Sequence, residues 1–206
     1  INFTVLKKNR KEYRITSERC RDSKVAYFMY FVLYSFVGFI LETLYTLITR
    51  GILISKKCFL INLLCPVYGL GAIAIISCTR PIKQYKILTF VMGGLAATVV
   101  EYVLHFIYQE ILGVSIWNYS NLPYNINGRV CLMFTVFWSI LSMGLVYFIH
   151  PLVEKRMAAM PKTLFAVLLL FVGMDAMIST LLYKKFGNKQ AVSLPWLLSN
   201  YRNKLG

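Results

Sequence analysis

The stretch that decides the fold is "VAYFMYFVLYSFVGFILETLYTL", residues 25–47, in which Glu42 is the only charged side chain. A helix of roughly 20 predominantly apolar residues is long enough to cross the hydrocarbon layer of a membrane, which is about 30 Å thick. A helix at the surface of a soluble protein would instead carry a polar face toward water. We therefore predict that residues 25–47 form a transmembrane helix.

Four more apolar stretches follow this one along the chain. They cover residues 58–78, 87–112, 130–149 and 163–183. Of the 206 residues, 58% are hydrophobic and only 15% are charged, whereas about a quarter of the residues are charged in a typical soluble domain. We predict an all-α fold, namely a polytopic integral membrane helical bundle with about five transmembrane helices.

The second stretch differs from the others because it contains Pro66, Gly69 and Gly71. Proline and glycine interrupt helices, and interrupted backbone at membrane depth is tolerated where protein surrounds it. The second span is therefore either a continuous helix or a broken, re-entrant one, and the sequence leaves both open.

The basic residues predict the orientation and the domain limits. The net charge is +15, and most of the 23 lysines and arginines face the cytoplasm if the N-terminus does. By the positive-inside rule we expect a cytoplasmic N-terminus in a multi-pass protein of the cell membrane. Residues 1–24 form a basic juxtamembrane segment suited to anionic lipids, residues 25–183 the membrane domain and residues 184–206 a basic tail. Because the basic block adjoins a span, we expect lipid and not nucleic acid as its partner.

Three of the eight acidic residues fall well inside predicted spans, namely Glu42, Glu101 and Asp175, whereas Glu110 lies close to the boundary of the third span and is expected to be an interfacial residue. A charged group inside a membrane costs several kcal/mol unless it is paired or hydrated, so each acid is a functional-site hypothesis. Small residues precede both glutamates at helical steps of three and four, which predicts that both face neighbouring helices and not lipid. The alternative is a purely structural hydrogen bond between helices.

Arg129 enters the fourth span from the side on which all three acids are expected to lie. We predict that its guanidinium sits between Glu42 and Glu101, because a buried cation requires an anion. His105 follows Glu101 by one helical turn and is expected to be a hydrogen-bonding partner or a proton shuttle.

Other polar residues are expected in the same half of the membrane and complete the candidate binding site. They are Asn62 and Cys65 in the second span, and Tyr119, Asn125 and Asn127 in the loop 113–128. The loop residues have a simpler alternative, in which the asparagines cap the next helix and the aromatic residues form an interfacial belt. The sequence contains no cysteine–histidine spacing typical of a metal site, and we predict no metal or cofactor.

Several motifs occur in an order that resembles a known family. They are "YSFVGFILETLY" (34–45), "CPVYGLGA" (65–72), "EYVLHFIYQEILGVSIWNYSNLPYNINGRVCL" (101–132) and "FW" (137–138). Together they resemble the bacterial membrane proteins called ABC-transporter type IV, or CmpB-like. The resemblance implies a role in transport. Because the chain has no phosphate-binding G-x-x-x-x-G-K-[ST] loop, any ATPase would be a separate subunit.

The favoured function is a permease-like protein that moves a small solute or ion, as a homo-oligomer or with partner subunits. One alternative is an intramembrane enzyme on a lipid-linked substrate, with a glutamate as base and Arg129 holding an anion. The sequence shows neither a G-x-S-x-G nor an H-E-x-x-H motif, so we expect no enzyme and name no catalytic residue. The other alternative is a non-catalytic scaffold or receptor, in which the buried charges only fix helix packing.

Overall fold

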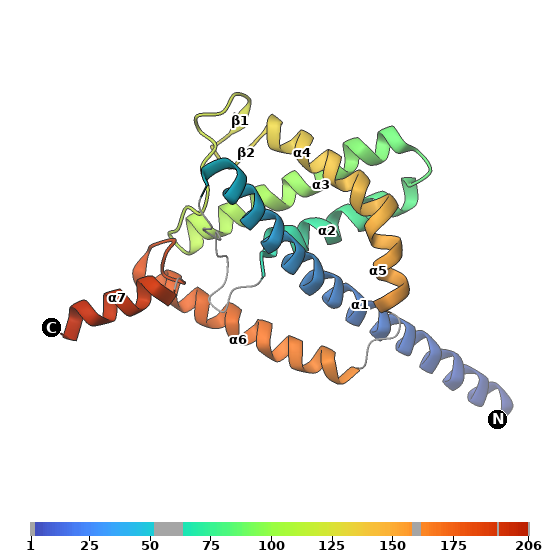
Figure 1. Cartoon of the computed structure of the whole chain (residues 1–206). Coiled ribbons are helices and arrows are strands. Elements are labelled where there is room, and N and C mark those ends of the chain that lie inside the picture. Colours follow the sequence, from blue (N-terminus) through green and yellow to red (C-terminus); the bar gives the residue numbers. More distant parts are fainter. Residues whose placement is uncertain (1–2, 52–63, 158–161, 193, 206) are drawn as a thin grey trace.

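The computed structural model describes residues 3–51, 64–157, 162–192 and 194–205 (Figure 1). These residues form helices and one small two-stranded sheet. Within the described ranges four helical segments are long and apolar enough to cross a membrane: Lys24–Thr49, Lys86–Ile111, Leu132–Arg156 and Thr163–Phe186. The structure therefore confirms the predicted all-α membrane bundle.

Helix α1 (Phe3–Arg50) contains the basic N-terminal segment and the first span in one continuous helix. The described helix has no break near residue 24, where the sequence predicts the edge of the membrane domain. The domain limits themselves stay a prediction.

Helix α2 (Pro66–Thr79) is a shorter apolar helix that ends in a 3₁₀ turn, Arg80–Ile82. Pro66 is at its first position, where the missing N–H costs nothing. The backbone N–H of Cys65 donates to the carbonyl of Ser35 at 3.0 Å. Ser35 lies near the middle of the first span, so α2 begins well inside the apolar layer. This favours the interrupted form of the second span; residues 58–63 lie outside the described residues.

Helices α3 (Lys86–Phe106) and α4 (Leu132–Gly144) pack closely against each other and continue as π-helical turns, Ile107–Ile111 and Leu145–Ile149. The close approach depends on Gly94, because a Cβ there would overlap the side chain of Ser139. Helix α5 (His150–Met157) extends α4. In Figure 1, α1 and α3 run in one direction, while α2 and α4 return.

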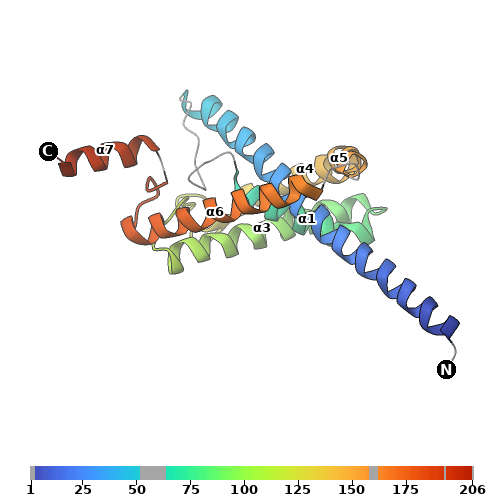
Figure 2. The ribbon, with the colours of Figure 1, turned by 90° about the horizontal axis from the view of Figure 1, so that it is seen from below.

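Helix α6 (Lys162–Phe186) runs along one face of the bundle in the same direction as α1 and α3 (Figure 2). Near its start Phe165 packs edge-on against Phe28 of α1, with ring centroids 5.2 Å apart. Near its end Tyr183 packs in the same way against Tyr108, at 5.8 Å. Helix α7 (Leu194–Leu205) follows.

A β-hairpin precedes α4, formed by β1 (Asn125–Ile126) and β2 (Val130–Cys131). Asn127 and Gly128 in its turn both have positive φ angles, 53° and 66°. Asn-Gly is the dipeptide that tolerates two consecutive residues in this conformation. We call the end of the bundle that carries residues 112–131 the loop end.

Candidate functional site

The centre of the candidate site is Glu101, which lies on α3 near the loop end and is only 4% exposed. Its Oε1 accepts a hydrogen bond from the Tyr119 hydroxyl, and its Oε2 accepts one from Trp138 Nε1, each at 3.0 Å. Glu101 faces into the bundle, as the spacing of small residues predicts. Among the residues that the structure describes, none places a cationic group within ion-pair distance of it.

Glu42 of α1 lies beside this centre and has its own aromatic partner. Its Oε2 accepts a hydrogen bond from the Tyr68 hydroxyl at 3.1 Å. The Tyr68 ring packs against the Trp138 ring, with centroids 5.1 Å apart. Glu42 is close enough to interact electrostatically with Glu101. The two acids thus share one cluster, which we call the carboxylate–aromatic cluster: Glu42, Tyr68, Glu101, Tyr119 and Trp138.

The short helix α2 places Tyr68 in this cluster. Gly38 of α1 faces Tyr68 so closely that a Cβ on the glycine would overlap the tyrosine side chain. The glycine in the first-span stripe therefore admits an aromatic ring beside the helix backbone. This is a specific use of the small residues that the sequence predicts at helix contacts.

The loop between α3 and α4 supplies Tyr119. Its ring stacks on Phe134 of α4, with centroids 4.6 Å apart. Burial raises the pKa of the Tyr119 hydroxyl well above its ordinary value, and the neighbouring Glu101 and Glu42 carboxylates raise it further. The hydroxyl therefore remains protonated at neutral pH and acts as a hydrogen-bond donor to Glu101.

His105 is buried on the same face of α3 as Glu101, but its hydrogen bond is to the loop between α3 and α4. Its Nε2 lies 2.7 Å from the carbonyl oxygen of Trp117, which can only accept, so this nitrogen carries the proton. Trp117 Nε1 in turn donates to the carbonyl of Arg129 at 2.9 Å. In the described part of the chain the Nδ1 of His105 is buried without a hydrogen-bond partner. The structure thus supports a hydrogen-bonding role, with the loop and not Glu101 as partner.

The predicted position of Arg129 between Glu42 and Glu101 is wrong. Its Nη2 lies 2.7 Å from Oε1 of Glu110, and its other nitrogens donate to Gln109 and Tyr102. Glu110 and Gln109 are on the π-helical turn after α3, which adds a residue to the helical turn and displaces the side chains that follow. From the sequence, Glu110 is predicted to be a residue at the boundary of the third span. The sequence does not predict the π-helical turn that carries it.

The asparagines of the loop hold the hairpin together. Asn125 donates to the carbonyl of Leu122 at 2.8 Å and accepts from the N–H of Gly128 at 3.0 Å. Asn127 donates to the Tyr102 hydroxyl at 3.1 Å. Within the fully described loop 112–131 none of them caps α4, whose N-cap residue is Cys131. The hydrogen-bond partners described for the two asparagines are Ser120, Leu122, Gly128 and Tyr102, which do not belong to the carboxylate–aromatic cluster.

Three predicted site residues remain, namely Asp175, Cys65 and Asn62, and none of them is a member of the carboxylate–aromatic cluster as defined above. Asp175 is buried on α6 and accepts a hydrogen bond from Ser179, one turn further along, at 3.2 Å. Neither glutamate is among its described hydrogen-bond partners. Cys65 is buried at the start of α2 and is close enough to Tyr68 to interact electrostatically with it. Asn62 lies outside the described residues.

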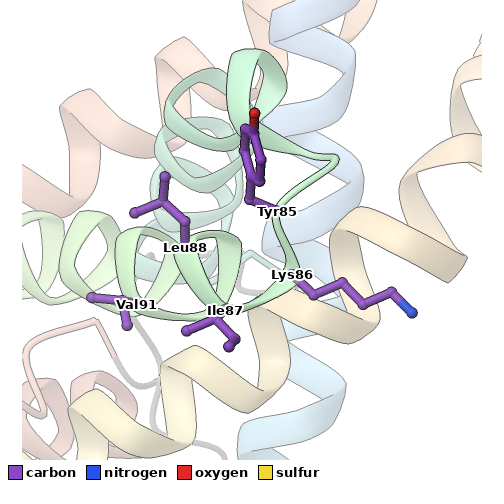
Figure 3. A pocket seen from close by; sticks show the side chains of 5 residues that line it. All are labelled: Tyr85, Lys86, Ile87, Leu88 and Val91. Atoms are coloured by element: carbon purple, nitrogen blue, oxygen red, sulfur yellow. The ribbon is translucent and has the colours of Figure 1, made fainter.

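A shallow hollow at the start of α3 lacks the buried acids that mark the candidate binding site around Glu101. It is lined by Tyr85, Lys86, Ile87, Leu88 and Val91 (Figure 3). The lining contains no acid, and the Lys86 side chain points away from Leu88 and Val91. The hollow also lies at the opposite end of α3 from Glu101.

The four long apolar helices, with polar side chains buried among them, define a multi-pass membrane protein. The chain belongs to the family described as "Putative ABC-transporter type IV", whose model matches residues 29–181. This match confirms the family that the motifs indicate. Comparisons with curated proteins and with solved structures found no match.

Two residues of the cluster, Tyr68 and Trp138, are absent from the site predicted from the sequence. Both lie in motifs that resemble the family, Tyr68 in "CPVYGLGA" and Trp138 in "FW". Their signal is the polar atom on an aromatic ring, because a buried tyrosine or tryptophan requires a hydrogen-bond partner. In an apolar bundle with few acids, that partner is most simply a buried carboxylate.

Proposed function

We propose that this protein is a permease, or a permease subunit, in which the carboxylate–aromatic cluster binds a proton or a cation during transport. The observation that carries the proposal is the environment of Glu101. Both of its oxygens receive hydrogen bonds from neutral donors, and no described cation lies within ion-pair distance.

The chemistry follows from the cost of a buried charge. An ionised carboxylate at membrane depth is stable only if it is paired, hydrated or neutralised by a proton. Tyr119 and Trp138 hold the carboxylate in place and stabilise its ionised form, but they leave its charge uncompensated. A proton or a mobile cation is therefore needed to complete the site. A site that is complete only with a mobile positive charge is suited to coupling that charge to movement of a solute.

The alternative of a purely structural role for the acids fits Glu110 better than Glu101. Glu110 has a fixed cationic partner in Arg129, whose charge it neutralises. The intramembrane-enzyme alternative requires Arg129 to hold an anionic group of the substrate, whereas Arg129 is already paired with Glu110 in the described residues. Because the chain has few spans, we expect it to work as a homo-oligomer or with a separate ATPase subunit, in the cell membrane.

Proton movement in liposomes tests the proposal. The purified protein is reconstituted with a pH-sensitive dye inside the vesicles, and a panel of solutes is added with and without ATP. We expect at least one solute to drive proton movement with the wild-type protein and not with Glu101→Gln. Glu154→Gln serves as the control, because Glu154 is an exposed acid at the other end of the bundle. Equal proton movement in wild type and Glu101→Gln contradicts the proposal.

A further inference from the structure

A half-open groove of about 80 Å³ runs between α1, α2 and α4. Its walls are mostly aliphatic, and two residues of its lining, Leu41 and Ile149, are 39% and 46% exposed. Helices α1 and α4 each contribute to a segment long and apolar enough to cross a membrane, so we expect this opening to face lipid. The groove therefore offers a lateral entrance from the membrane.

The lining includes two rings that belong to the carboxylate–aromatic cluster, Tyr68 and Trp138. Each ring directs its polar hydrogen at a carboxylate, Tyr68 at Glu42 and Trp138 at Glu101. Hydrogen bonds to an anion polarise the donor and make its ring more electron-rich. The faces of these rings are thus well suited to a positive charge, in the manner of a cation–π contact.

The third polar aromatic residue of the groove is Tyr34, whose hydroxyl lies 3.0 Å from Nδ1 of His150. All three aromatic polar atoms of the fully described lining are therefore engaged with residues outside it. The groove presents carbon atoms of aliphatic and aromatic side chains, and it offers a ligand no side-chain hydrogen-bonding group. A ligand that requires hydrogen bonds would lose them on entering.

From these properties we infer that the groove binds a hydrophobic organic cation of the quaternary-ammonium type, with its alkyl chain along the groove and its charge on the Tyr68 and Trp138 rings. Such a cation has no hydrogen-bond donor to satisfy, and the Glu101 carboxylate, which accepts the hydrogen bond from Trp138, supplies the complementary charge. The inference rests on the proposed function and names its substrate class.

A series of small ligands separates the contribution of the ligand's alkyl chain to the binding affinity from that of its positive charge. Binding is measured calorimetrically on the protein in nanodiscs of uncharged lipid, using hexyltrimethylammonium, tetramethylammonium and hexanoate. We expect hexyltrimethylammonium to bind about tenfold or more tightly than tetramethylammonium, because only the former buries an alkyl chain. Hexanoate is expected not to bind. Equal affinities of the two cations, or binding of hexanoate with the affinity of hexyltrimethylammonium, would overturn the inference.

A matched pair of variants on α4 tests the location. Leu141→Trp fills the groove, whereas Ile140→Trp puts the same side chain at a neighbouring position that is 59% exposed and does not line it. We expect Leu141→Trp to weaken hexyltrimethylammonium binding at least several-fold and Ile140→Trp to leave it unchanged. Equal affinities of the two variants contradict the location, and circular dichroism shows whether both remain folded.

The two proposals fail in different experiments. If the ligand series fails while Glu101→Gln still abolishes proton movement, only the substrate class is wrong. If Glu101→Gln does not change proton movement, the proposed transport function is wrong, whatever the groove binds.

Discussion

The guanidinium Nη2 of Arg129 lies 2.7 Å from Oε1 of Glu110, at the loop end of the bundle. Arg129, the only arginine between residues 112 and 149, is therefore paired with Glu110 and not with the buried Glu101. This pairing leaves Glu101 with neutral hydrogen-bond donors, which is the basis of the proposed proton or cation site.

The stability of the loop 112–131 should depend on the shape of the Arg129 guanidinium. Arg129 donates to three acceptors at once and lies over the rings of Tyr102 and Phe106, at 5.3 and 5.0 Å. Lysine cannot reproduce this fork, so we expect Arg129→Lys to destabilise the loop by about 1–3 kcal/mol. Limited proteolysis of residues 112–131 measures the effect. Glu110→Gln, at a half-exposed side chain, should increase cleavage less, and the reverse order contradicts the assignment.

The packing of α3 on α4 predicts a contrast between two glycines. We expect Gly94→Ala to destabilise the bundle by about 1–3 kcal/mol, because the added Cβ overlaps the Ser139 side chain. The control is Gly144→Ala on α4, where no atom lies within 4 Å of the added Cβ. Thermal unfolding in detergent should show a lower midpoint for the first variant only. Equal midpoints would mean that the two helices do not approach as described.

Two glycines of the loop allow the free-energy cost of a left-handed backbone conformation to be distinguished from the cost of steric overlap. Gly128 and Gly113 have almost the same positive φ, 66° and 67°, but only Gly128 is surrounded, by Ser120 and Asn118. Alanine at either position should cost about 1 kcal/mol for the left-handed conformation. Gly128→Ala should cost more, since its Cβ has no room. Proteolysis of the loop compares the two, and a smaller effect at Gly128 contradicts the turn geometry.

Removal of one hydroxyl should affect transport more than folding. Tyr119→Phe removes a donor to Glu101 and keeps the ring that stacks on Phe134. A hydrogen bond to a charged group contributes roughly 1.5–3 kcal/mol, so we expect transport to fall about tenfold or more. The control is Tyr124→Phe in the same loop, because that side chain is 79% exposed. If both variants transport equally well, the Tyr119 hydroxyl has no role in the site.

The sequence predicts the membrane helices well, because a long apolar stretch identifies each such helix largely on its own. It also predicts that Glu101 faces inward, since the small residues at Gly93 and Ala97 define one helix face. These inferences use only spacing along a single helix.

The partners of the buried charges could not be predicted in the same way. The π-helical turn at Ile107–Ile111 carries Glu110, which pairs with Arg129, and neither apolar periodicity nor residue spacing indicates such a turn. The start of α2 at Pro66 brings Tyr68 to Glu42. The residue before this helix, Cys65, donates a backbone hydrogen bond to Ser35, which is far from it in the sequence. Both features depend on tertiary contacts, which override local preference.

The protonation of Glu101 tests the central claim most directly. Infrared difference spectra of the membrane-embedded protein, recorded between high and low pH, report the carbonyl stretch of any carboxyl group that gains a proton. We predict a protonated-carboxyl band that appears as the pH falls and is missing from Glu101→Gln. An unchanged band in that variant would show that Glu101 does not take up the proton, and the proposed site would be wrong.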